Sequence, residues 1–327
     1  MNFIIGGTGF VGTRLCDRLK KFGIDFKIFD LKIGDTHKSQ TIQGNICDVS
    51  ALDAISNATV LINLAAVHRD DVRPLSLYDD VNIGGAKTLC NAARKFNINK
   101  IIFTSSVAIY GFAPAETDES GAPNYFNDYG RTKYLAEEVY KEWQAEDPDK
   151  RTLVIIRPTV IFGEGNRGNV YNLLRQIMVR RFVMFGSGKN KKSMAYVENV
   201  AAFIMHSVSF LPGLHIHNYI DKPDLDMNTL VSEARSTLFD KKNVGFRLPA
   251  FLGIGIGYIA DIISKIMNKR LTVSTIRVKK FMSTTQFSSS VNDSGFMPPV
   301  SLEEGMERTL RYEFLEDNSD KRTFETE

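Results

Sequence analysis

Tyr129 and Lys133 are four residues apart in the segment YGRTK, inside a stretch with helical spacing. Residues at this spacing share one helix face, so the phenol and the ammonium are expected to lie together. A phenol has a pKa of about 10 and is a poor base at neutral pH, but a nearby positive charge favours the phenolate. Ser106 is expected at a strand end, where its hydroxyl can bond the same substrate oxygen. Such a trio can take the proton of an alcohol while hydride leaves its carbon.

A glycine pattern near the start indicates where the hydride goes. Gly6, Gly9 and Gly12 are spaced by three between an expected strand and an expected helix. Glycine permits the tight turn and the close approach of backbone to pyrophosphate, and the helix N-terminus attracts the phosphates. The pattern predicts a dinucleotide site; a glycine turn without cofactor is the alternative.

Two acidic residues refine this prediction. Asp30 ends the second expected strand, 18 residues after Gly12. A carboxylate there accepts hydrogen bonds from both ribose hydroxyls and repels a 2′-phosphate, so NAD is favoured over NADP. Asp48 follows a third expected strand and is expected either to contact the adenine or to be an ordinary turn aspartate.

The elements that must position these residues alternate along the first half of the chain. Strands are expected at 2–5, 25–29, 59–64, 100–104 and 152–156, and helices at 10–22, 75–96 and 129–146. Such alternation predicts an α/β fold with a doubly wound parallel Rossmann sheet, and a smaller mixed α/β C-terminal substrate domain. We expect an NAD-binding domain at 1–165 and a mainly substrate-binding domain at 166–327, with a strand near 214–221 returning to the first. The polar last residues, from Leu315 on, are expected to be frayed.

Composition excludes several classes of protein. The 327 residues are 43% hydrophobic and 24% charged, unlike disordered, collagen-like or multi-span membrane chains. A net charge of +3 gives no reason to expect a nucleic-acid partner. The 3 cysteines show no CxxC spacing, so we expect no disulfide framework, no metal site and a reducing cytoplasm.

Several motifs together resemble the extended short-chain dehydrogenase/reductase family, over essentially the whole chain. They are the glycine pattern, Leu64–Ala66, Asn82, SSVAIYG from Ser105, YxxxK, and Arg157-Pro158. The resemblance implies a sugar-modifying enzyme with tightly held NAD(P), in which Ser106, Tyr129 and Lys133 are catalytic; homodimers are usual in this family. With the glycine and acidic residues above, it implies cofactor contacts from Phe10, Val11, Val49, Leu64, Ala65, Ala66, Asn82, Tyr129, Lys133 and Pro158.

The resemblance can be narrowed within the family. Its 4,6-dehydratases carry an Asp-Glu pair directly after the catalytic hydroxyl, whereas this chain has Val107-Ala108, so dehydration is disfavoured. Its 4-epimerases clamp the substrate diphosphate with two arginines, whose positions match Lys192 and Arg277 here. Lysine binds a phosphate as a point charge, not as a fork. Ser106 and Asn169 complete the expected substrate-binding set.

Longer segments are similar to the bacterial 4-epimerases of undecaprenyl-diphospho-N-acetylglucosamine, which serve surface polysaccharide (O-antigen) assembly. They are HRDDV (68–72), 159–174, 191–197, 218–228 and 277–287. This resemblance implies interconversion of GlcNAc and GalNAc on the lipid diphosphate through a 4-keto intermediate. Three alternatives stay open: a 4-epimerase of UDP-GlcNAc or UDP-glucose, an NAD(P)-dependent sugar reductase, and an NAD-sensing protein without catalysis.

One segment is strongly basic. Residues 241–282 hold nine lysines and arginines and one acid, Asp261, around the apolar stretch 248–260. A short apolar element flanked by basic residues suits an anionic membrane surface. We therefore expect either peripheral contact with the inner face of the cytoplasmic membrane or a buried helix with solvated lysines.

Overall fold

A seven-stranded sheet dominates the computed structural model, which describes residues 1–69, 72–267 and 275–325. All its neighbouring strands are parallel. In spatial order the strands are β10 (Gly213–Tyr219), β6 (Thr152–Pro158), β5 (Lys100–Thr104), β4 (Val60–Asn63), β1 (Asn2–Ile5), β2 (Phe26–Asp30) and β3 (Thr41–Gln43). The predicted fold class is confirmed.

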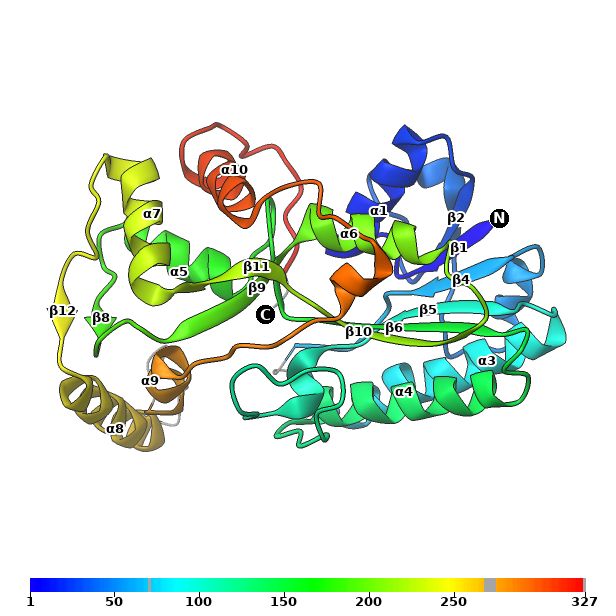
Figure 1. The fold of residues 1–327 in the computed structure, drawn as a ribbon, viewed down its shortest axis with the longest axis horizontal. Helices are drawn as coiled ribbons and strands as arrows, with labels where there is room; N and C mark the ends of the chain where they lie inside the picture. The colour runs from blue at the N-terminus through cyan, green and yellow to red at the C-terminus, as the bar shows by residue number, and fades with distance from the viewer. Residues whose placement is uncertain (70–71, 268–274, 326–327) are drawn as a thin grey trace.

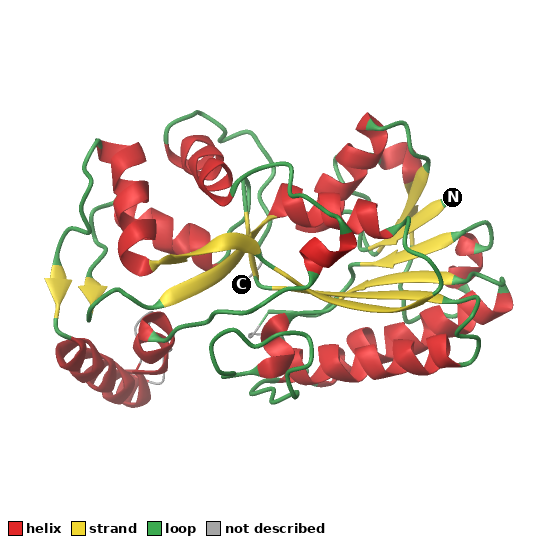
Figure 2. Cartoon of the chain, viewed as in Figure 1, coloured by secondary structure: helices red, strands yellow, loops and turns green. Residues whose placement is uncertain are grey.

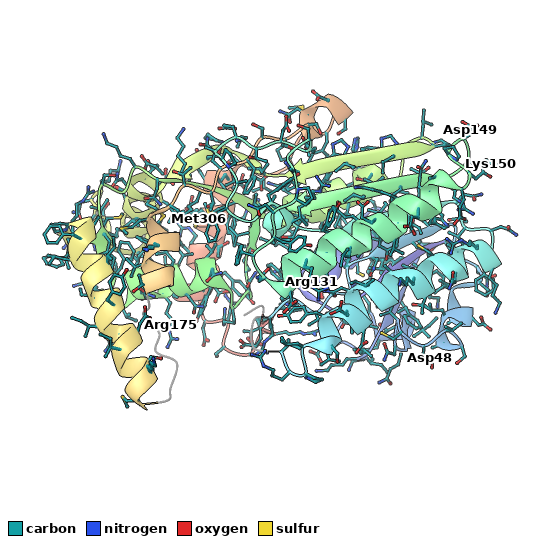
Figure 3. All side chains as sticks on the ribbon, turned by 90° about the horizontal axis from the view of Figure 1, so that it is seen from below. Asp48, Arg131, Asp149, Lys150, Arg175 and Met306 are labelled. Atoms are coloured by element: carbon teal, nitrogen blue, oxygen red, sulfur yellow. The ribbon has the colours of Figure 1, made fainter. Side chains whose placement is uncertain are left out.

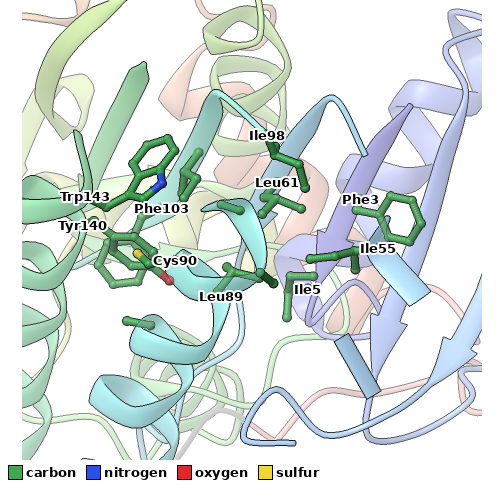
Figure 4. Packing of buried hydrophobic residues seen from close by; sticks show 14 of the residues in the cluster. Phe3, Ile5, Ile55, Leu61, Leu89, Cys90, Ile98, Phe103, Tyr140 and Trp143 are labelled. Atoms are coloured by element: carbon green, nitrogen blue, oxygen red, sulfur yellow. The ribbon is translucent and has the colours of Figure 1, made fainter. Parts of the chain in front are cut away.

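Helices cover both faces of this sheet (Figure 1). α1 (Phe10–Lys21) and α6 (Val197–Ser207) pack together on one face, and α3 (Gly85–Lys95) and α4 (Asp128–Ala145) on the other. Figure 4 shows the core between the sheet and the second pair, where Phe103, Tyr140 and Trp143 are completely or almost completely buried. The helix predicted over 75–96 is formed by α2 (Ser76–Tyr78), a π-helical turn (Asp79–Gly84) and α3.

The smaller part of the molecule lies beyond the carboxyl ends of the large sheet (Figure 2). Its central sheet contains β11 (Asp221–Asp226), β9 (Lys191–Tyr196) and β7 (Val160–Phe162), and a second sheet pairs β12 (Arg247–Leu248) with β8 (Met184–Phe185). Its helices are α5 (Asn169–Met178), α7 (Met227–Phe239), α8 (Ala250–Met267), α9 (Thr275–Met282) and α10 (Leu302–Phe314). β10 pairs with β6 in the large sheet, and the domain boundary at residue 165 stays a prediction.

The C-terminal tail differs from expectation. Phe324 donates its N–H to the Gly165 carbonyl at 2.8 Å, and its own carbonyl accepts from the Arg167 N–H at 2.9 Å. The Phe324 ring packs against Phe10, with 5.6 Å between ring centroids. The prediction of a frayed tail is therefore wrong at this point, because one aromatic residue and its peptide groups find partners far away in the sequence.

Two glycines with left-handed backbone provide a test of how tightly the loops are packed. Gly111 follows the short helix η4 (Val107–Tyr110) with φ +61°, and a Cβ there would overlap the Asn124 carbonyl oxygen. Gly23 has φ +66°, and a Cβ there would meet nothing within 4 Å.

We expect Gly23→Ala to lower the free energy of unfolding by about 1 kcal/mol through backbone strain alone, and Gly111→Ala to lower it by at least twice as much. Urea unfolding followed by circular dichroism measures both; equal losses would contradict the clash.

Candidate active site

The predicted catalytic and cofactor residues converge on one edge of the large sheet. Gly6 follows β1, Leu64 follows β4, and Ser106 comes shortly after β5. Asp30 and Pro158 are the last residues of β2 and β6. Because the strands are parallel, their carboxyl ends lie along the same edge. The strand order reverses between β1 and β4, which is where open α/β sheets bind their ligands.

The glycine turn is shaped for close approach. Gly6 has φ +80°, and a Cβ there would lie 2.7 Å from the Ala65 nitrogen. A Cβ at Gly12 would lie 2.6 Å from the Gly7 Cα, so this glycine lets α1 pack directly against the turn.

The start of α1 fits a dinucleotide phosphate. Gly9 is the N-cap of the helix, and a Cβ there would have one neighbour within 4 Å, the Gly6 carbonyl oxygen at 3.4 Å. Phe10 and Val11 are the first residues of the helix, whose N–H groups have no acceptor within the helix. The turn therefore leaves room for a pyrophosphate beside unpaired donors and the positive end of the helix dipole.

Asp30 is held by a residue that the sequence analysis did not single out. Its Oδ2 accepts hydrogen bonds from the Thr8 N–H at 3.0 Å and the Thr8 hydroxyl at 2.9 Å. Its Oδ1 accepts one long bond, 3.4 Å, from the Lys32 N–H. Thr8 thus fixes the carboxylate against the glycine turn, at the position where the adenosine ribose is expected.

Asp48 has a local role in the structure. Its Oδ1 accepts from the Ser50 N–H (2.9 Å), the Ser50 hydroxyl (2.7 Å) and the Ala51 N–H (3.3 Å), at the start of η2 (Ala51–Ile55). These bonds lower the pKa of Asp48. Asp48 lies on the surface, and the neighbouring Val49 is exposed (Figure 3). Contact of these two residues with adenine stays a prediction.

The beginning of α4 places Tyr129 beside Ser106. The Asn127 side chain caps the helix by accepting from the Gly130 N–H at 2.9 Å. A Cβ at Gly130 would lie 2.5 Å from the Ala108 carbonyl oxygen, so glycine lets α4 touch η4. Burial raises the pKa of Tyr129, and a hydrogen bond with Ser106 lowers it in part.

Lys133 lies one helical turn further along and is 2% exposed. Its Nζ is 4.2 Å from the centre of the Phe103 ring. Burial lowers the pKa of Lys133 to about 7, and the Glu137 carboxylate opposes this shift. The phenol and the ammonium are thus both pushed towards their neutral forms. The positive ring of bound NAD would supply the additional charge that favours the phenolate.

A buried polar network fixes α4 against β6. Arg157 donates to both oxygens of Glu137, at 3.0 Å and 2.6 Å. It also donates to the Tyr110 hydroxyl at 2.6 Å, which donates in turn to Asn218 Oδ1 at 2.9 Å. The network joins α4, β6, η4 and β10. Glu137 was not among the predicted site residues, and its one signal in the sequence is its four-residue spacing from Lys133.

Asn82 ties the loop after β4 to α4. Its Oδ1 accepts from the Val67 N–H at 2.8 Å, and its Nδ2 donates to the Val67 carbonyl and the Thr132 hydroxyl, both at 2.9 Å. These bonds make Asn82 a positioning residue for the loop that contains Leu64–Ala66. Its contact with the cofactor stays a prediction.

The predicted diphosphate clamp is brought together in part. Lys192, on β9, donates to the Ser283 carbonyl at 2.7 Å, just after α9. Burial lowers the pKa of Lys192 to about 8. Asn169 is the exposed first residue of α5. Arg277 belongs to α9, but its side chain lies outside the part that the structure describes, as do residues 70–71 of HRDDV. The roles of these residues stay predictions.

Comparison with known proteins decides the family. The model of the NAD dependent epimerase/dehydratase family matches residues 2–212. The chain belongs to the NAD-dependent epimerase/dehydratase family. This confirms NAD as the cofactor and the prediction of an enzyme of the epimerase type.

Two curated relatives span nearly the whole chain. The chain is 48% identical to the N-acetyl-alpha-D-glucosaminyl-diphospho-ditrans,octacis-undecaprenol 4-epimerase of Escherichia coli O157:H7, over 99% of this chain and 98% of the relative. It is 27% identical to a UDP-glucose 4-epimerase of Vibrio cholerae, over 97% and 96% of the two chains.

Solved structures of epimerases share the fold. A UDP-N-acetylglucosamine 4-epimerase of Bacillus cereus aligns with a TM-score of 0.73 and 15% identity, over 94% of this chain and 97% of its own. The Thermus thermophilus UDP-glucose 4-epimerase, in complex with NAD, gives a TM-score of 0.71 and 18% identity, over 95% and 98%. The likeness in fold therefore extends over both the large parallel sheet and the smaller part of this molecule.

The burial of Lys133 predicts a pH-dependent stability. An unfolded lysine has a pKa of about 10.4, so between about pH 7 and pH 10 the unfolded state binds more protons than the folded state. The free energy of unfolding should then rise with pH across this range. In NAD-free protein, we expect Lys133→Met to remove part of that rise.

Urea unfolding at several pH values measures this effect. Lys150→Met is the matched control, because Lys150 is 73% exposed, and its profile should follow the wild type. Parallel profiles for wild type and Lys133→Met would contradict the burial argument.

Proposed function

We propose that this protein is an NAD-dependent 4-epimerase that interconverts N-acetylglucosamine and N-acetylgalactosamine on undecaprenyl diphosphate. The observation that carries the proposal is the 48% identity, over 99% of the chain, to the Escherichia coli enzyme named for that reaction. The UDP-glucose 4-epimerase relative, at 27% identity, supports the same chemistry on a nucleotide sugar as the alternative.

The site suggests how each residue acts. Tyr129, as phenolate, accepts the proton of the sugar 4-hydroxyl, and Ser106, its hydrogen-bond partner, donates to the same oxygen as it becomes a carbonyl. Lys133 stabilises the phenolate by its charge. NAD, held by the glycine turn and Asp30, would supply the hydride acceptor for C4 and the hydride for its return to the opposite face of the ring. Tyr129 then returns the proton, so the reaction involves no net oxidation.

The diphosphate must stay fixed while the 4-keto sugar turns about its anomeric linkage. Lys192 lies beside the end of α9, the helix that contains Arg277. Its depressed pKa reflects a charge held out of water, which an anionic phosphate would compensate. We assign Lys192, Arg277 and Asn169 to the diphosphate.

A paired assay tests the proposal. Purified protein receives undecaprenyl-diphospho-GlcNAc in one tube and UDP-GlcNAc in the other, without added NADH, and the released sugars are separated. We expect GalNAc from the lipid tube, and none from Tyr129→Phe with unchanged circular dichroism. GalNAc from the UDP tube alone would assign the enzyme to nucleotide sugars. An active Tyr129→Phe variant would refute the mechanism.

We further propose that α8 lies on an anionic membrane surface. Small residues form the inward face of this helix, because Gly253, Gly257 and Ala260 are buried. Large apolar side chains face outward and are exposed: Phe251, Leu252, Ile256, Tyr258, Ile259, Ile262 and Met267. A helix in water has the opposite arrangement. α8 occupies the outer edge of the smaller part, away from the large sheet (Figure 1).

The basic residues around α8 favour an anionic lipid surface as the partner of its exposed apolar side chains. Arg247, Lys265 and Lys279 are exposed on and around the helix, and anionic headgroups attract such residues. No helix in the described part of the chain has the length and apolar character to cross a bilayer. α8 also packs on α9, whose C-terminal end lies beside Lys192. A membrane at this face would therefore bring a lipid-linked diphosphate close to the clamp.

Flotation with vesicles tests this contact. We expect the protein to float with phosphatidylglycerol vesicles, and Ile259→Ser combined with Ile262→Ser to stay in the dense fraction. Met297→Ser is the matched control, since Met297 is 84% exposed elsewhere and should not matter. Unchanged flotation of the double variant would refute the proposal. A dimer that the double variant dissociates would assign the face to a second copy instead.

A further inference from the structure

The tail that follows α10 returns to the dinucleotide end of the molecule. The Asn318 side chain donates to the Tyr312 carbonyl at 3.0 Å, which fixes the turn after the helix. The chain then runs back towards the middle of the molecule (Figure 1). There Phe324 forms its two backbone hydrogen bonds with residues 165–167.

The loop that binds this tail is itself held by α10. Gly165 donates its N–H to Glu313 Oε1 at 2.7 Å, and Arg167 forms an ion pair with Glu313 Oε2 at 2.6 Å. α10 therefore holds the same loop that Phe324 binds. The Phe324 ring packs on Phe10, the residue that follows Gly9 at the start of α1. The tail thus touches the helix N-terminus at which the pyrophosphate is expected.

Arg322, also in the tail, brings a positive charge beside the glycine turn. Its guanidinium lies over the Phe324 ring, 4.8 Å from the ring centre. A Cβ at Gly34 would lie 3.2 Å from both Arg322 Nη1 and the Thr8 Cβ, so the cation lies beside the glycine turn and the loop after β2. Arg322 also forms a long ion pair with the exposed Asp35, 3.8 Å from Nε to Oδ2.

We propose that the tail completes the dinucleotide site, with Arg322 as a ligand of the NAD pyrophosphate and Phe324 as its anchor. An exposed ion pair of this length contributes little, so the guanidinium can exchange Asp35 for a phosphate. Arginine pairs with phosphate through two parallel hydrogen bonds, which are among the strong ones in proteins. The inference depends on the NAD of the family and not on the sugar substrate proposed above.

Binding measurements on the full-length, NAD-free protein test this assignment. NADH is titrated by its fluorescence, and ADP and adenosine are measured by competition. We expect Arg322→Gln to weaken NADH and ADP about tenfold and to leave adenosine unchanged, because only the first two carry the pyrophosphate. The loss should shrink at high salt. Lys321→Gln is the matched control, with the same change of charge at a 58% exposed neighbour, and should bind like the wild type.

Phe324→Ala tests the anchor separately. We expect faster dissociation of NADH from this variant, with unchanged unfolding of the NAD-free large sheet. Three results would overturn the assignment: wild-type binding by Arg322→Gln, an equal loss for adenosine and ADP, or an equal effect of the two glutamine variants. None of these three results would change the outcome expected in the sugar assay. This assignment can therefore fail while the proposed function holds.

Discussion

The ion pair between Arg157 and Glu137 is the interaction on which the arrangement of the predicted catalytic residues depends. Glu137 is fully buried, and a carboxylate there without a partner would be severely destabilising. Arg157 satisfies both of its oxygens and passes the network on to η4 and β10 through Tyr110. This fixes the position of α4 against β6. Two further contacts then orient the face of α4 that holds Tyr129 and Lys133: Gly130 against Ala108, and Thr132 against Asn82.

The same burial determines the electrostatics of the site. Water is excluded around Lys133, so its charge is costly, and the Glu137 carboxylate one turn away offsets part of that cost. Tyr129 is also disfavoured in its charged form, with one hydrogen bond from Ser106 in compensation. A site in which both groups favour neutrality produces little phenolate until a cation arrives. In the proposed mechanism a bound oxidised nicotinamide would be such a cation, and its binding would activate Tyr129 as the base.

The sequence predicts the features of the site that depend on local spacing. The glycine turn, Asp30 and YxxxK are defined within a few residues of chain, and strand alternation places them on one edge of a sheet. Contacts between distant segments could not be predicted in this way. Phe324 meets Gly165, Lys192 meets Ser283, and Thr8 holds Asp30 through pairings that no periodicity encodes. Whether the apolar residues of α8 are buried or exposed also could not be predicted, because this depends on which side of the helix the neighbouring elements cover.

The cofactor end and the substrate end of the predicted site have opposite requirements for access, and different elements border them. A cofactor that is regenerated in each turnover need not leave, and its expected end is bordered by the glycine turn, the loop after β2 and the anchored tail. A substrate must enter and leave in every cycle. Its expected end is bordered by α9, by Lys192 and by a helix whose apolar residues face outward. If the lipid stayed in the bilayer while its sugar turned in the site, the protein would need a fixed height above the membrane. In that case α8, which packs on α9 near the proposed diphosphate-binding residues, would set that height.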